Sequence, residues 1–129
     1  MKPLSTNIYT FSDLIGEGCL YVDKTRYLLD LVETPKGQFF LSRPRRFGKS
    51  LMLTTLKAIF QGKRELFEGL HIATADYDWP VHPVIHLNMG SVAASTAAEL
   101  ETGLSFTMRQ EAANHGVVLH EKAASLQFL

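Results

Sequence analysis

The chain has 129 residues, of which 46% are hydrophobic and 20% charged, and its 13 basic and 13 acidic residues give a formal net charge of zero. This length allows one domain at most, and the composition is typical of a globular protein. No apolar run approaches the roughly 20 residues that span a bilayer, and the N-terminus lacks the apolar core of a secretory signal. We therefore expect no membrane partner and a cytoplasmic location. The single cysteine, Cys19, excludes an internal disulfide.

The first part of the chain predicts a helix followed by a strand. Residues 1–10 are polar and irregular. Residues 23–33 predict a helix that Pro35 and Gly37 close, and residues 38–42 predict a short buried strand. The apolar face of the helix comprises Tyr27, Leu28, Leu31 and Val32.

A second helix is expected over residues 50–61, with Gly62 at its C-terminal end. Residues 64–70 predict one or two helical turns, and residues 73–83 form a loop rich in breakers. The apolar face of this second helix comprises Met52, Leu53, Leu56, Ile59 and Phe60.

The last part of the chain predicts a strand over residues 84–89 and a helix that starts near Thr96. Thr96 and Glu99 fit a capping box, and residues 114–116 end the helix. Its apolar positions recur every four residues, at Leu100, Leu104, Met108 and Ala112. The apolar residues 126–129 indicate a chain cut inside a larger domain.

Residues 43–50, Arg-Pro-Arg-Arg-Phe-Gly-Lys-Ser, lie between a predicted strand and a predicted helix, which is the layout of a nucleotide phosphate-binding loop (P-loop, or Walker A motif). Gly48 lets backbone N–H groups close around an anion, and the helix start adds positive potential. Lys49 would reach the β- and γ-phosphates of ATP, and the Ser50 hydroxyl would ligate Mg²⁺. The alternative is a surface turn before a helix.

The loop departs from the usual G-x-x-x-x-G-K-[ST] pattern at its first glycine, where this chain has Arg43. Arginine tolerates positive φ poorly, and Pro44 stiffens the loop further. Arg43 is expected to have a structural or phosphate-binding role. Arg45 and Arg46 either contact phosphate or a partner, or are solvated charges.

The positive charge is concentrated around this loop. No acidic residue occurs from 34 to 64, a range that holds eight of the basic residues. Such a block favours polyanions, either a nucleotide or a nucleic acid, and nucleotide phosphates explain it most simply. The eight are Lys36, Arg43, Arg45, Arg46, Lys49, Lys57, Lys63 and Arg64.

Residues 21–25 (Tyr-Val-Asp-Lys-Thr) and 41–51 (Leu-Ser-Arg-Pro-Arg-Arg-Phe-Gly-Lys-Ser-Leu), with further matches up to residue 87, resemble the predicted AAA-ATPase-like proteins of bacteria. In that family arginine replaces the first loop glycine. The resemblance implies a P-loop NTPase-like three-layer α/β fold, of which residues 1–129 would be an incomplete N-terminal part. Members are usually several times longer, carry a second strand ending in acidic residues, and often have a nuclease-like domain through which nucleic acid could be a partner.

The alternating helices and strands also favour a parallel sheet. Two strands are too few for such a sheet, however, since sheets usually have about four to six strands. The missing strands would come from absent sequence, from segments that the pattern does not reveal, or from another copy of the chain in a homo-oligomer.

The resemblance also places Tyr21 and Val22 beside the base of the nucleotide, with Asp23 and Thr25 fixing the next helix. The simpler alternative is that Asp23 is only an N-cap and Tyr21 part of the core. The expected nucleotide-binding residues are Arg43, Pro44, Arg45, Arg46, Phe47, Gly48, Lys49, Ser50, Leu51, Tyr21 and Val22, with Ser50 as the metal ligand.

Hydrolysis of ATP requires a second anchor for Mg²⁺ and a group that positions water. The predicted strand over residues 84–89 ends in Asn-Met-Gly and supplies no carboxylate. We therefore expect nucleotide binding with poor or absent turnover, and the sequence names no catalytic residue. The alternative function is a non-catalytic interaction module that uses the basic loop to bind nucleic acid or a partner chain.

Overall fold

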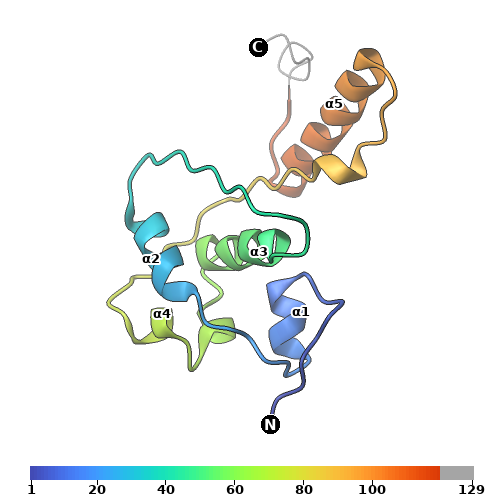
Figure 1. Ribbon diagram of the computed structural model, residues 1–129. Coiled ribbons are helices and arrows are strands. Elements are labelled where there is room, and N and C mark those ends of the chain that lie inside the picture. Colours follow the sequence, from blue (N-terminus) through green and yellow to red (C-terminus); the bar gives the residue numbers. More distant parts are fainter. Residues whose placement is uncertain (120–129) are drawn as a thin grey trace. The chain divides into compact units, whose positions relative to one another are not determined.

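The computed structural model describes residues 1–119 and divides the chain into two compact units, Met1–Val84 and Ile85–Leu129. The predicted apolar end at residues 126–129 lies outside the described residues. The assignment of residues 1–129 to one part of a larger domain stays a prediction. The first unit contains α1 (Phe11–Gly16), α2 (Thr25–Glu33), α3 (Lys49–Phe60), the 3-10 turn η1 (Arg64–Phe67) and α4 (His71–Thr74) (Figure 1). The second contains the 3-10 turn η2 (Met89–Ser91) and α5 (Ala97–Asn114).

The expected three-layer α/β P-loop fold is wrong for this structure, because residues 1–119 contain helices and no strand. Of the two predicted strands, residues 38–42 have no regular structure there; residues 84–88 have none either, and Met89 begins η2. An apolar strand is stable only when neighbouring strands pair with its backbone and another layer covers its side chains. Neither condition is met at residues 38–42, where the Phe40 side chain is 93% exposed.

Three of the predicted helices are confirmed as α2, α3 and α5. The end of α3 also agrees: Gly62 is left-handed at φ 70°, and the amides of Gly62 and Lys63 donate to the carbonyls of Ile59 and Ala58. This pair of bonds is a Schellman motif, which satisfies carbonyls that the helix itself leaves unpaired. The predicted turns after α3 correspond to η1, while α4 extends into the predicted loop.

Helix α1 has no counterpart among the predicted elements. It has six residues, and its N-cap, Thr10, provides no side-chain hydrogen bond. The amide of Phe11 instead donates to Oγ1 of Thr54, which lies in α3. A helix this short depends on such tertiary contacts, and a local pattern does not reveal them.

The core of the first unit forms around α3, which contacts α1, α2 and η1. Aromatic rings supply much of this core: the centroids of Phe11 and Phe67 are 4.7 Å apart, and those of Phe67 and Trp79 are 5.1 Å apart. Aromatic pairs at these distances contribute more than their buried area alone. The buried residues of this hydrophobic cluster are Phe11, Leu28, Ala58, Ile59, Phe67, Ile72 and Trp79.

Asp23 and Thr25 join the starts of α2 and α4. One oxygen of Asp23 accepts from the amide and hydroxyl of Thr25, at 2.9 and 2.6 Å, and the other accepts from the amide of His71 at 2.7 Å. The hydroxyl of Thr25 in turn accepts from the amide of Ile72 at 3.1 Å. The N-cap position of α2 belongs to Lys24 and not to Asp23. Asp23 instead accepts from the first amides of two helices at once.

In the second unit, α5 begins with the predicted capping box. Thr96 Oγ1 accepts from the amide of Glu99, and the Glu99 carboxylate accepts from the amide of Thr96. The helix ends at Asn114, within the predicted residues 114–116, and Gly116 beyond it is left-handed. None of its residues is fully buried within the described part of the chain: Leu104, Met108 and Ala112 are half-buried, and Leu100 is exposed. None of the helices in residues 1–119 combines the length and hydrophobicity needed to cross a bilayer.

The Asp23 bridge predicts a pH-dependent contribution to stability. Partial burial disfavours the Asp23 carboxylate, but the hydrogen bonds from the Thr25 side chain and from the His71 and Thr25 amides outweigh it and lower the pKa of Asp23 below its ordinary value of 3.8. The ionised form is thus the one that the fold binds best. Its contribution is fully present above about pH 4 and is lost as the pH falls through the lower pKa of the folded state.

We expect Asp23→Asn to lower the free energy of unfolding of the first unit by about 1 kcal/mol at pH 7, because the amide group cannot accept from both helix starts. Urea unfolding followed by the fluorescence of Trp79, the single tryptophan, measures this change. The difference from the unmodified chain should shrink below about pH 4. Asp30→Asn, at an exposed carboxylate of α2, is the control, and equal effects of both substitutions at pH 7 would contradict the prediction.

Candidate functional site

The start of α3 has an unusual N-cap. Gly48 occupies this position in the left-handed conformation, with φ 80° and ψ 19°, and no side chain caps the helix. A residue with a Cβ is strained at such a φ, although the space around Gly48 is open. The backbone conformation at residue 48 is therefore one that favours glycine, while the predicted closing of amides around an anion stays a prediction.

The first-turn amides of α3 have no hydrogen-bond partner among residues 1–119. The carbonyl of Gly48 accepts from the amide of Met52 at 2.9 Å, which is the first bond of the helix. The amides of Lys49, Ser50 and Leu51 precede that bond, and within residues 1–119 no hydrogen bond satisfies them. Unpaired amides at a helix start carry partial positive charge and favour an anion.

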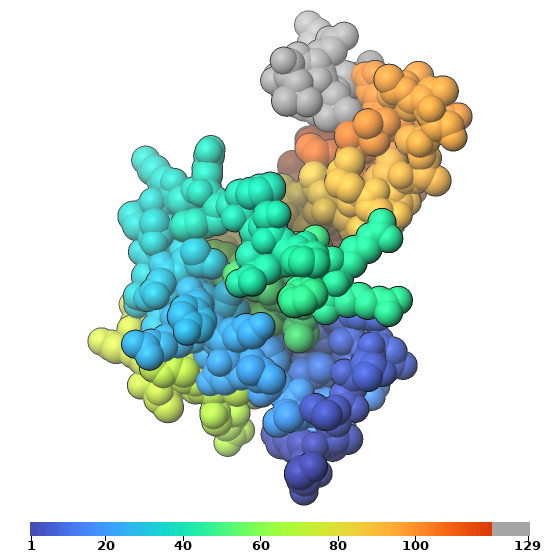
Figure 2. Space-filling model, viewed as in Figure 1, coloured from blue at the N-terminus to red at the C-terminus, as the bar shows by residue number. Residues whose placement is uncertain are grey.

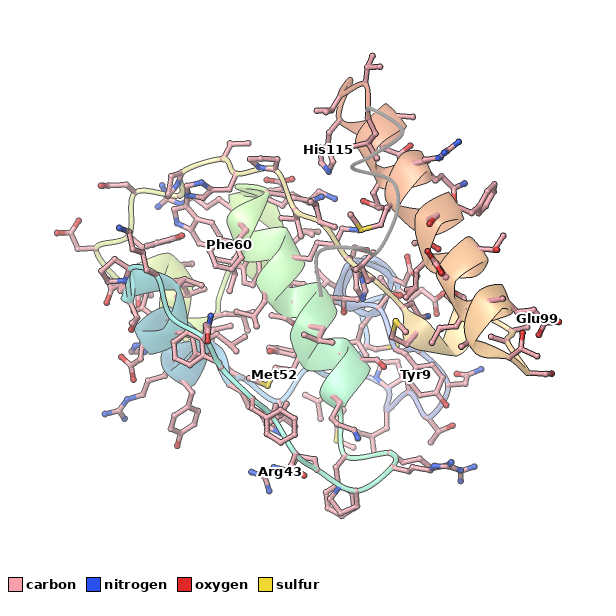
Figure 3. The ribbon with its side chains drawn as sticks, turned by 90° about the horizontal axis from the view of Figure 1, so that it is seen from above. Tyr9, Arg43, Met52, Phe60, Glu99 and His115 are labelled. Atoms are coloured by element: carbon pink, nitrogen blue, oxygen red, sulfur yellow. The ribbon has the colours of Figure 1, made fainter. Side chains whose placement is uncertain are left out.

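The loop that leads into this helix start is basic and solvent-exposed. All residues from 43 to 48 are exposed, and no ion pair involves Arg43, Arg45, Arg46 or Lys49 within residues 1–119. Figure 2 shows this segment, coloured teal to green, with side chains projecting from the surface of the first unit. In Figure 3, Arg43 lies on the loop ahead of α3, with Met52 and Phe60 further along the helix. The arrangement presents several cations next to free amides.

The backbone of the loop is left-handed at two positions. Besides Gly48, Arg46 has a positive φ of 65°, whereas Arg43 is not among the residues with positive φ. Arg43, at the position of the usual first glycine, therefore does not adopt the left-handed conformation. The left-handed residues of this loop lie nearer to the helix.

The remaining loop residues differ in their surroundings. Phe47 is 63% exposed, the Lys49 side chain is half-buried, and Leu51 packs against the core of the first unit. Ser50 is exposed, and its hydroxyl makes no hydrogen bond within the described part of the chain. Leu51 thus anchors the turn while Ser50 leaves its hydroxyl available. No cluster of three or more His, Cys, Asp or Glu side chains suited to a metal occurs in residues 1–119.

Tyr21 is brought to α3, but one turn beyond the loop. Burial raises the pKa of Tyr21, and a hydrogen bond with the Thr55 side chain opposes that shift. Its ring lies 5.0 Å from that of Phe11, so the interpretation of Tyr21 as part of the core agrees with these contacts. Val22 is 68% exposed. A place for either residue beside a base stays a prediction.

Two threonines that the sequence analysis did not single out contact the first turn of α3. Thr54 Oγ1 lies 3.1 Å from the carbonyl oxygen of Ser50, and Thr55 Oγ1 donates to that of Leu51 at 2.6 Å. The sequence signal that could have revealed them is a pair of adjacent threonines in an apolar helix. Thr54 follows Ser50 by four residues, and Thr55 follows Leu51 by four. Such residues often bond the carbonyl one turn earlier.

Comparison with known proteins identifies the family. The family model described as Predicted AAA-ATPase matches residues 5–128. The chain is also 36% identical, over 139 aligned residues, to the "Uncharacterized protein in vnfD 5'region" of Azotobacter chroococcum mcd 1. That alignment covers 96% of this chain and 27% of the relative, so the chain spans about a quarter of the relative's length. No solved structure matches the chain significantly. On this family match, the chain belongs to the predicted AAA-ATPase family.

Proposed function

We propose that residues 43–51 bind the phosphates of ATP together with Mg²⁺. The observation that carries this proposal is the start of α3, where left-handed Gly48 replaces a capping side chain and leaves the amides of Lys49 and Ser50 free. Family membership supports it, because the family is described as Predicted AAA-ATPase. The proposal requires only this loop and helix.

Each polar group of the turn has a distinct task in this proposal. The amides of residues 48–51 surround phosphate oxygens, and the Lys49 ammonium neutralises their charge. The Ser50 hydroxyl takes one coordination position on Mg²⁺, which prefers oxygen ligands and keeps several waters. Arg43, Arg45 and Arg46 raise the local concentration of the anion by their positive potential.

A second candidate function is binding of nucleic acid or a partner chain by the same basic loop. The exposed phenylalanines near these arginines favour it, since Phe40 and Phe47 are 93% and 63% exposed and aromatic faces stack on unpaired bases. Such binding would depend steeply on salt. It would not depend on one lysine at the helix start, and this difference separates the two functions.

Lys49→Ala should weaken the binding of ATP·Mg²⁺ by roughly ten- to hundredfold, the effect of losing a charged hydrogen bond worth about 1.5–3 kcal/mol. Isothermal titration calorimetry on the full chain measures this. Lys63→Ala is the matched control: it removes the same charge from the same basic block at the other end of α3, where the side chain is exposed, and should bind as the unmodified chain does. Salt-sensitive DNA binding that Lys49→Ala leaves unchanged, without ATP binding, would favour the second function.

Ser50→Ala should remove most of the gain in ATP affinity that Mg²⁺ provides and leave the affinity measured with a chelator nearly unchanged. The reason is that the hydroxyl contacts the metal and not the phosphates in this proposal. The measurement is a pair of titrations for each variant, with excess Mg²⁺ and with EDTA. An equal loss of affinity under both conditions would show that Ser50 acts on the phosphates instead.

We expect the 129-residue chain to bind ATP with little or no turnover. The apolar segment 84–89 after Ser50 ends without a carboxylate that could act as a second Mg²⁺ anchor. At saturating ATP, the unmodified chain should release inorganic phosphate no faster than the Lys49→Ala variant does. Appreciable hydrolysis that this substitution abolishes would refute the expectation.

A further inference from the structure

We propose that Thr54 is a positioning residue for the phosphate-binding turn, because its side chain joins the first turn of α3 to the first residue of α1. This inference rests on the proposed nucleotide function and adds a determinant of affinity that lies outside residues 43–51. It also gives the N-terminal segment of the chain a part in that function.

A single oxygen makes the connection. Thr54 Oγ1 accepts from the amide of Phe11 at 3.1 Å. The same oxygen lies 3.1 Å from the carbonyl oxygen of Ser50, 3.0 Å from that of Leu51 and 3.4 Å from that of Tyr9. A hydroxyl has one proton, so it donates to one of these carbonyls at a time while it accepts from Phe11. The first turn of α3 and the start of α1 are therefore held by the same atom.

The start of α1 is a firm reference point for this bond. The Phe11 side chain is fully buried, and its ring stacks against that of Phe67 in the core. The amide of Phe11 is one of those that a helix leaves unpaired at its start, and Thr10 does not cap it. Thr54 is thus the acceptor that α1 depends on, and loss of its hydroxyl would leave a partly buried amide without a partner.

Holding a carbonyl of the first turn also orients the next amide. The peptide group is planar, so the carbonyl of Ser50 and the amide of Leu51 turn together as one unit. That amide is one of the groups proposed to face phosphate. Thr55 acts on the following peptide group, since its hydroxyl donates to the Leu51 carbonyl and its side chain is fully buried. The two threonines therefore restrain two successive peptide groups of the turn.

The test compares Thr54→Val with Thr54→Ser by calorimetric titration with ATP·Mg²⁺. Valine keeps the shape and removes the hydroxyl, and should weaken binding by about tenfold, as is usual for groups that orient a ligand-binding residue. Serine keeps the hydroxyl and should restore most of the affinity. Ile72→Val, a buried change in α4, is the control for lost stability and should bind as the unmodified chain does. Trp79 fluorescence confirms that each variant is folded.

The possible outcomes separate this inference from the function on which it rests. If Lys49→Ala has no effect on binding, the nucleotide function fails. If Lys49→Ala weakens binding but Thr54→Val does not, the function stands and the role of Thr54 is overturned. The role is also overturned if serine fails to restore affinity or if Ile72→Val weakens binding as much as Thr54→Val does.

Hydrogen exchange on the unmodified chain provides a test that does not depend on a variant folding. Binding of ATP·Mg²⁺ should slow exchange of the Phe11 amide together with the amides of Ser50 and Leu51, because the bound anion stabilises the turn that Thr54 ties to α1. Protection that is confined to the start of α3, with unchanged exchange at Phe11, would contradict the proposed coupling.

Discussion

The conformation of Gly48 is the constraint on which the candidate site depends. Its positive φ turns the chain directly into α3 without a capping side chain, so the first amides of that helix stay unpaired. A residue with a side chain would either be strained at this φ or move the chain out of it. This one turn joins the basic loop on one side to the free amides on the other.

The rest of the first unit determines where this turn lies. Helix α3 packs through Ala58 and Ile59 into the core, and its first turn is braced by Thr54 and Thr55. Asp23 and Thr25 perform a similar task for α2 and α4, since each accepts from the amide at the start of a helix. Short helices in this unit are thus positioned by side chains of other elements, because none of those described has a side-chain hydrogen bond from its own N-cap residue.

Local signals in the sequence predicted local structure well. The capping box at Thr96 and the glycines at 62 and 116 gave correct ends for α5 and α3, since each acts within one helical turn. The two strands were wrong because residues 38–42 find no pairing partner within the described residues. Helix α1 and the role of Thr54 were missed because both depend on a bond across 43 positions. The loop itself could be predicted from its motif, whereas its binding role stays a proposal.

The most direct test of the account follows backbone amide signals of the isotope-labelled chain by NMR during a titration with ATP·Mg²⁺. The account predicts that the amides of Gly48, Lys49, Ser50 and Leu51 shift most, and that they saturate together with a single dissociation constant. Signals from these residues that stay in place at saturating ATP·Mg²⁺, while amides elsewhere move or no amide moves at all, would contradict it.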